Sequence, residues 1–203
     1  GGGIYVWAEP LTLINTSIHS NIGGGIYTTS GTSNPPIVLI QNSTVSKNQG
    51  TGVAAGFVTI INSTISDNKG RGVVADQQNN TSFLKNSIIA GNVTSMAGPD
   101  CYGTFSSHGY NIIGDTSFCT ITATTGDRFD VDPKLGVFLP AVGYQPLLAG
   151  SPAIDHGNDC PLTDQRQAGR SGVCDIGAYE YTTPLAASKL YANTGEHHLT
   201  GPG

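Results

Sequence analysis

Short runs of apolar residues alternate along this chain with a seven-residue motif that begins and ends with Asn. The motif occurs four times, as NTSIHSN, NSTVSKN, NSTISDN and NSIIAGN, starting at residues 15, 42, 62 and 86. The copies lie 27, 20 and 24 residues apart, while the motif itself keeps its length. A fixed motif with variable connections is typical of a structural repeat that takes insertions in its loops.

Each repeat contains three segments short enough to be β-strands. An apolar run precedes each motif (LTLI, VLIQ, VTII and SFLK), and a Gly-x-Gly-aliphatic step follows the first three copies and also opens the chain. The segments are too short and too β-branched for helices. They predict one coil of a single-stranded parallel β-helix per repeat, with equivalent positions stacked about 4.8 Å apart.

The apolar residues of successive repeats fall into four columns that would point into the coil. Alternate positions are mostly Thr, Ser or other polar residues, as the two-residue period of a strand requires. The columns are Leu13, Ile40, Ile60 and Leu84; Leu11, Val38 and Val58, with Ser82 as a weak member; Ile18, Val45, Ile65 and Ile89; and Ile4, Ile26, Val53 and Val73.

The first Asn of each motif is predicted to occupy a corner of the coil. Asn tolerates the left-handed conformation that a sharp corner needs, and its amide can donate to and accept from the Asn of the next coil. The second Asn of each motif, at 21, 48, 68 and 92, would mark the next corner. We therefore predict a ladder of side-chain amides formed by Asn15, Asn42, Asn62 and Asn86.

Glycosylation is the competing interpretation of these residues. A buried amide cannot accept a glycan, so we favour the ladder for the corner positions. Asn79 and Asn80 lie in the polar stretch DQQNNTS and are better candidates for glycosylation. The N-x-Ser/Thr sequons are at Asn15, Asn42, Asn62, Asn79, Asn80 and Asn92.

Charge and hydropathy argue against two classes of partner. The net charge of −5 and the pI near 5.3 give no electrostatic footprint for nucleic acid. No apolar run is long enough to span a membrane. No basic and apolar leader opens the chain, so we expect any signal peptide to have been removed.

The four cysteines point to export. Cys101, Cys119, Cys160 and Cys174 are separated by 18, 41 and 14 residues, whereas a zinc site favours closely spaced pairs. Four cysteines allow three pairings, and their local order favours Cys101–Cys119 and Cys160–Cys174. Disulfides imply an oxidising compartment, so we expect an extracellular or cell-surface protein. The alternative is four unpaired buried thiols.

The repeat decays after residue 95, and the C-terminal part carries motifs of its own. These are GSPAID from Gly150, DQR from Asp164 and CDIGAYEY from Cys174. With the Asn-Ser-Thr coils, they resemble the choice-of-anchor Q domain proteins over residues 1–181. The resemblance implies a right-handed parallel β-helix of the pectin-lyase-like superfold, a bacterial surface or secreted location, and adhesin-like or unknown roles without an established catalytic set.

We accordingly expect three parts in the chain. Residues 1–95 are β-helix coils, 96–181 are an irregular last coil and a disulfide-tied cap, and 182–203 are an extended tail. The charged residues of the cap have the types found in catalytic clusters, but a polar plug over the open end of a solenoid is the simpler explanation. These residues are Asp155, Asp164, Arg166, Asp175 and Glu180.

Metal binding and catalysis are the less favoured alternatives. Asp127, Asp130 and Asp132 could hold calcium, but DRFDVDP lacks the Gly and terminal Glu of an EF-hand, so we expect no cofactor. Glycoside hydrolysis needs two carboxylates on one face. The acids of residues 1–99 are Glu9, Asp67 and Asp76, which occupy different columns. Asp67 aligns with Lys47 and predicts a surface ion pair, and His19 is expected to be solvated in an outward column with Ser46, Ser66 and Ala90.

The expected function is structural. We predict a non-enzymatic, self-assembling filament or cell-surface subunit whose partner is a copy of itself. An adhesin or carbohydrate-binding module is the alternative, and a polysaccharide lyase or hydrolase is less favoured. The tail would pair with the opening coil of a neighbour, or else fold back on its own subunit. The interface would use the aromatic and apolar residues Ile4, Tyr5, Trp7, Tyr27, Leu185, Leu190, Tyr191 and Leu199.

Overall fold

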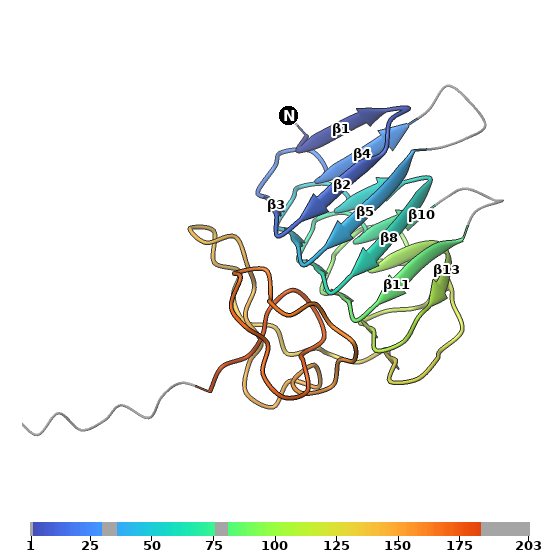
Figure 1. Cartoon of the computed structure of the whole chain (residues 1–203). Helices are drawn as coiled ribbons and strands as arrows, with labels where there is room; N and C mark the ends of the chain where they lie inside the picture. The colour runs from blue at the N-terminus through green and yellow to red at the C-terminus, as the bar shows by residue number, and fades with distance from the viewer. Residues whose placement is uncertain (1, 30–35, 76–80, 184–203) are drawn as a thin grey trace, which may run out of the picture.

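The computed structural model describes residues 2–29, 36–75 and 81–183, and these residues form an all-β chain wound into a stack of coils (Figure 1). Two sets of expectations lie outside the described residues. These are the glycosylation candidates Asn79 and Asn80, and the tail residues Leu185, Leu190, Tyr191 and Leu199.

Each of the first four coils gives one strand to each of three parallel sheets, which confirms the predicted parallel β-helix. All pairings between these strands are parallel. Sheet A contains β1 (Ile4–Trp7), β4 (Ile26–Thr29), β7 (Val53–Ala55), β10 (Val73–Ala75), the start of β13 (Cys101–Ser107) and β15 (Cys119–Thr120). Sheet B contains β2 (Leu11–Ile14), β5 (Ile37–Gln41), β8 (Phe57–Ile61), β11 (Ser82–Lys85) and the end of β13. Sheet C contains β3 (Ser17–His19), β6 (Thr44–Ser46), β9 (Thr64–Ser66), β12 (Ile88–Ala90), β14 (Ile112–Ile113) and β16 (Arg128–Phe129).

The strand register confirms the four predicted inward columns. Ile60 pairs with Ile40 on one side and Leu84 on the other, and all three side chains are buried. The column of Ile18 continues through Val45 and Ile65 to the end of sheet C. Burial of one Val, Ile or Leu side chain contributes about 1.5–3 kcal/mol, so stacking these columns stabilises the coils.

The last coil is irregular because the single strand β13 spans sheets A and B, whereas each earlier coil has a separate strand in each of these sheets. Its first residues pair with β10 in sheet A and its last residues pair with β11 in sheet B. Gly103 has φ 117°, and a Cβ there would lie 2.0 Å from the carbonyl oxygen of Ala75, so only glycine fits. Cys119, Ile121 and Phe129 then pack against the end of the core.

Residues 133–181 form a module with little regular structure that lies against the outer side of sheet C. A second apolar cluster joins Ile88 and Ile112 of sheet C to Leu147 and Ile176 of this module. The module is tied by a disulfide as expected, but the prediction that it covers the end of the stack is wrong. The end is covered by the preceding residues 115–130, and the module, orange in Figure 1, covers the side.

Candidate functional site

The seam between sheet C and the C-terminal module is joined by two side-chain amides, of which Gln145 is buried and Gln165 is partly buried. The Gln145 side chain accepts a hydrogen bond from the Ser66 hydroxyl, and its Nε2 donates to Asp67 Oδ2 at 3.1 Å and to the Gly136 carbonyl at 2.8 Å. Gln165 repeats this arrangement one coil earlier. It accepts from the Thr44 hydroxyl and donates to the carbonyl oxygen of a module residue. The two glutamines therefore fix the module to successive coils.

Two predictions about the outer face of sheet C have different outcomes. Ser46 and Ser66, expected to face solvent with His19, are fully buried under the module, and the His19 ring packs against Phe138 with ring centroids 4.9 Å apart. The expectation of a solvated column is therefore wrong. The predicted ion pair between Lys47 Nζ and Asp67 Oδ2 is confirmed at 2.9 Å.

The first Asn of each motif does form the predicted corner in the left-handed conformation. The φ angles of Asn15, Asn42, Asn62 and Asn86 are 52°, 47°, 45° and 48°. The predicted amide ladder is wrong at this corner, because only the Asn86–Asn62 rung is present, at 3.5 Å. The Asn42 and Asn86 amides instead donate to the carbonyl oxygens of Thr163 and Asn158 at 3.0 and 2.7 Å. These corner side chains hold the module.

The neighbouring serines supply the hydrogen bonds between coils at this corner. The Ser43 hydroxyl accepts from the backbone N–H of Thr16 at 3.0 Å, and Ser63 and Ser87 do the same for the coils that precede them. Each hydroxyl also donates to a carbonyl two residues earlier in its own coil. The two adjacent residues thus have different roles, since Asn forms the turn and Ser links the coils by hydrogen bonds.

A continuous amide ladder is present at the second Asn of the motif. Asn21 Nδ2 donates to Asn48 Oδ1 at 2.8 Å, and the same bond joins Asn48 to Asn68 and Asn68 to Asn92 at 2.9 Å. Each Oδ1 also accepts a backbone N–H from the previous coil. The last rung is a carboxylate, because Asn92 donates to Asp100 Oδ1 at 2.9 Å. A glycan on Asn92 would displace this buried ladder.

Asp100 is the charged end of that ladder and is almost fully buried. Burial raises the pKa of its carboxyl above the ordinary value, although the side-chain and backbone N–H groups of Asn92 oppose the shift. A proton on the carboxyl is therefore favoured by folding. Asp100 ends the ladder, because its Oδ1 accepts the last side-chain N–H, from Asn92.

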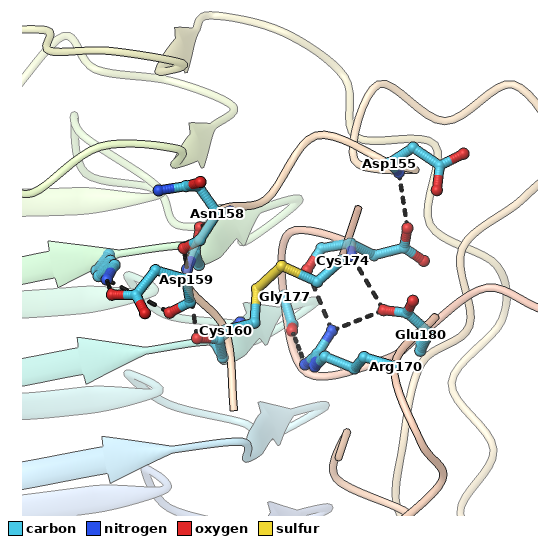
Figure 2. Close-up of a disulfide and its surroundings, with 12 residues drawn as sticks. Asp155, Asn158, Asp159, Cys160, Arg170, Cys174, Gly177 and Glu180 are labelled. Carbon is cyan, nitrogen blue, oxygen red and sulfur yellow. Dashed lines mark hydrogen bonds and ion pairs between the residues drawn. A yellow bond between two sulfur atoms is a disulfide. The ribbon is translucent and has the colours of Figure 1, made fainter. Parts of the chain in front are cut away.

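The predicted polar network of the C-terminal module is present, and it has a member that the sequence did not reveal. Asp164, fully buried, pairs with Arg166 at 2.7 Å and accepts the backbone N–H of Glu180. The Glu180 carboxylate pairs with Arg170 at 3.0 Å, and Arg170 also donates to the carbonyl oxygens of Asp175 and Gly177 (Figure 2). Each carboxylate thus has a guanidinium partner and a backbone donor, which fits the structural interpretation.

The Asp175 carboxylate belongs to the network as predicted, whereas the Asp155 carboxylate does not. The buried Asp175 carboxylate accepts the backbone N–H groups of Asp155 and Tyr181, and burial raises the pKa of Asp175 to about 6 against these bonds. The Asp155 side chain is exposed, and only its backbone takes part (Figure 2). Asp155 has φ 55°, so it serves as a turn residue.

Both predicted disulfides, Cys101–Cys119 and Cys160–Cys174, are confirmed. The second lies beside the Arg170–Glu180 pair and close to Asp159, whose carboxylate pairs with Lys85 of β11 at 2.7 Å (Figure 2). The hydrogen bond from Lys85 lowers the pKa of Asp159. Disulfides are typical of oxidising compartments.

The calcium candidates each accept hydrogen bonds from a different set of protein groups. Asp127 accepts hydrogen bonds from Ser107 and Asn111, Asp130 accepts them from Thr116, and Asp132 caps its own turn at Lys134. Within residues 2–29, 36–75 and 81–183, no three His, Cys, Asp or Glu side chains gather closely enough to hold a metal ion. Asp127 and Asp130 link segments 14 to 20 residues apart, and Asp132 bonds within a local turn.

The predicted aromatic surface is present on sheet A. The Tyr5 and Tyr27 rings stack with centroids 5.7 Å apart and planes 17° apart, and both are more than half exposed. Trp7 lies on the same strand as Tyr5 and is 59% exposed. Ile4 is partly buried and packs against the solenoid core, as its inward column predicts, and its part in an interface stays a prediction.

Sequence reasoning missed Gln145, Gln165, Arg170 and Asp100. Their partners lie 5 to 149 residues away, with no fixed spacing that a sequence pattern could reveal. One signal was available: the short side chains of Ser46, Ser66 and Ala90 leave room for a second layer of chain on sheet C.

Comparison with known proteins identifies the solenoid. Residues 2–128 match a family model described as the right-handed beta helix region. Neither a curated protein nor a solved structure matches the chain. In the described part of the chain, no helix has the length and apolar character needed to cross a membrane.

Proposed function

The chain belongs to the right-handed β-helix family, and from this premise we propose that it is an exported structural protein that assembles with copies of itself at a cell surface or in a filament. The family includes enzymes as well as structural and adhesive proteins. The finer relationship that we propose, on the C-terminal motifs, is to the choice-of-anchor Q domain proteins.

The exposed aromatic group of the first two coils is the observation that carries this proposal. The rings of Tyr5, Trp7 and Tyr27 lie on sheet A, are each more than half exposed, and offer the apolar area that a self-association surface needs. The two disulfides support export.

The experiment is to replace the aromatic group and follow assembly by light scattering. We expect the double variant Tyr5→Ser, Trp7→Ser to remain folded, because both side chains are exposed, but to lose self-association. Leu162→Ser is the matched control, because Leu162 is 90% exposed on the module and far from the first coil in sequence. Assembly that survives in the double variant refutes this surface. A chain truncated after Tyr181 tests separately whether the tail contributes.

Carbohydrate binding, as an adhesin or a binding module, is the second candidate. The stacked pair of Tyr5 and Tyr27 favours it, because parallel exposed rings can pack against the apolar face of a sugar. Assembly and sugar binding are separated by adding soluble oligosaccharide to the assembly assay. Competition supports the second candidate, whereas an unchanged scattering signal supports the first. Release of sugar from a panel of polysaccharides would instead indicate an enzyme.

A further inference from the structure

A polar groove runs along the seam between the solenoid corner and the C-terminal module. Three adjoining pockets of about 390, 300 and 730 Å³ make it, and Lys47 and Asp67 line all three. Pockets of 300–1,000 Å³ are typical of small-molecule sites. The groove therefore has room for a ligand longer than any one of its pockets would hold.

The floor of the groove is a column of residues in the left-handed conformation. Ser20, Lys47, Asp67 and Gly91 follow the sheet C strands of four successive coils, with φ between 55° and 72°. Four stacked coils span about 14 Å, from three steps of ~4.8 Å. The backbone turns outward at every step, so the floor has a regular repeat along the stack.

The two walls come from different parts of the chain. One wall is formed by Gln49, Lys69 and Val93, which follow the ladder asparagines in three successive coils. The backbone N–H of each donates to a carbonyl oxygen of the preceding coil. The other wall is the start of the module with the residue before it, and it contributes Asp132 and Val137. Val93 and Val137 are 68% and 79% exposed, which leaves apolar surface at the rim. The module forms a wall of the 300 and 390 Å³ pockets, whereas the 730 Å³ pocket is lined by solenoid residues.

The centre of the groove presents a donor and an acceptor side by side. Lys47 Nζ and Gln145 Nε2 both bond to Asp67 Oδ2, at 2.9 and 3.1 Å. Among the described residues, no donor bonds to the other oxygen, Oδ1, and the Asp67 side chain is 28% exposed. Lys47 has two further N–H groups to donate. A vicinal pair of hydroxyls could donate to Asp67 Oδ1 and accept from Lys47.

We propose that this groove binds a neutral, linear oligosaccharide of about three residues. Two lysines (Lys47 and Lys69) and two aspartates (Asp67 and Asp132) balance the formal charge of the lining, which favours a neutral ligand over an acidic one. Hydroxyl groups match the paired donor and acceptor, and the sugar ring faces match the valines at the rim. The site is distinct from the aromatic surface of the first coil, and its function is binding.

The test is titration of the isotope-labelled full chain with neutral trisaccharides, followed by NMR. The probes are cellotriose, xylotriose, mannotriose and maltotriose, with trigalacturonic acid as the acidic comparison. We expect at least one neutral probe to shift the amide signals of Lys47, Gly91 and Val137 and the side-chain amide of Gln145. Asp67→Asn and Lys47→Gln should each weaken this binding about tenfold or more, since each removes a charge-assisted hydrogen bond.

Two further variants separate a binding defect from a folding defect. Lys85→Gln removes the Lys85–Asp159 ion pair, which also joins solenoid and module, and should leave binding unchanged. Val137→Arg obstructs the groove at an exposed position and should abolish binding without changing the melting temperature. The proposal is overturned if all four neutral probes leave the groove signals unmoved at millimolar concentration, or if Asp67→Asn and Lys47→Gln both bind as the parent does. Tighter binding of the acidic probe, or shifts centred on Tyr5 and Tyr27, also overturns it.

Discussion

Replacing Asn68 should destabilise the solenoid more than replacing Asn62, although both side chains are fully buried and they are the last and first residues of the same motif. The Asn68 side chain makes four hydrogen bonds. Its Nδ2 donates to Asn92 and to the Val45 carbonyl, and its Oδ1 accepts from the backbone and the side chain of Asn48. Asn62 has one weak rung at 3.5 Å, and its Nδ2 has no partner among the described residues.

The magnitudes follow from what each change leaves unpaired. Asn68→Ala orphans the buried backbone N–H of Asn48 and removes one of two donors to Asn92 Oδ1, so we expect a loss of about 2–4 kcal/mol. Asn62→Ala forces Ala into φ 45°, which costs about 1 kcal/mol. Asn62→Gly relieves that strain and should be close to neutral.

The assay is equilibrium unfolding in urea with the disulfides intact, followed by circular dichroism. The urea midpoints of Asn68→Ala, Asn62→Ala and Asn62→Gly are compared with that of the parent. Where the slope of the unfolding free energy against urea concentration is the same, a change in midpoint reports a change in stability. The reasoning is refuted if Asn62→Ala loses as much stability as Asn68→Ala. That result would indicate that the stabilising amide ladder is formed by the first Asn of each motif.

Four other predictions follow from the buried charges and the disulfides. Asp100→Asn should raise the melting temperature more at pH 7 than at pH 4. Because the pKa of Asp100 is raised in the folded state, the stability that its protonated carboxyl contributes is present at low pH and is lost as pH rises, whereas Asn keeps the acceptor oxygen without the charge. An equal change in melting temperature at both pH values contradicts this. For the same reason Asp175, with its pKa near 6, should make the parent lose stability as pH rises from about 4 to 6, measured by thermal melts across that range. Arg170→Ala should cost about 3–5 kcal/mol, because it leaves the buried Glu180 carboxylate unpaired, and limited proteolysis should then cut within 157–174; resistance equal to the parent argues against the network. Peptide mapping without reduction should recover Cys101–Cys119 and Cys160–Cys174, and separate removal of each bond should cost about 2–4 kcal/mol.

The sequence predicts the solenoid well because its physics is local and periodic. The positions of Leu13, Ile40 and Ile60 repeat with the motif, so one strand pattern specifies every coil. The left-handed corner at Asn42 and Asn62 follows from residue preference alone. The spacing does not show which Asn column forms the hydrogen-bonded ladder, because both ends of the motif are Asn. The surroundings of each side chain in the folded chain determine this.

The seam and its groove could not be read in the same way. The place of the module depends on Gln145 reaching Ser66 and Gln165 reaching Thr44, contacts between segments with no shared period. A cluster of acids and arginines also looks the same in a lateral module and in an end cap. The part of the groove between Asp67 and Val137 depends on that placement, so the sequence does not reveal it.

The lateral position of the module is the central claim of this account, and zero-length carbodiimide cross-linking tests it most directly. The reagent joins a lysine to a carboxylate only when the two are in contact. Lys47–Asp67, at 2.9 Å within the solenoid, is the internal control, and Lys85–Asp159, at 2.7 Å, joins β11 to the module. We predict that mass spectrometry of the cross-linked monomer recovers both peptides. Recovery of Lys47–Asp67 without Lys85–Asp159 would contradict a module that lies along the side of the stack.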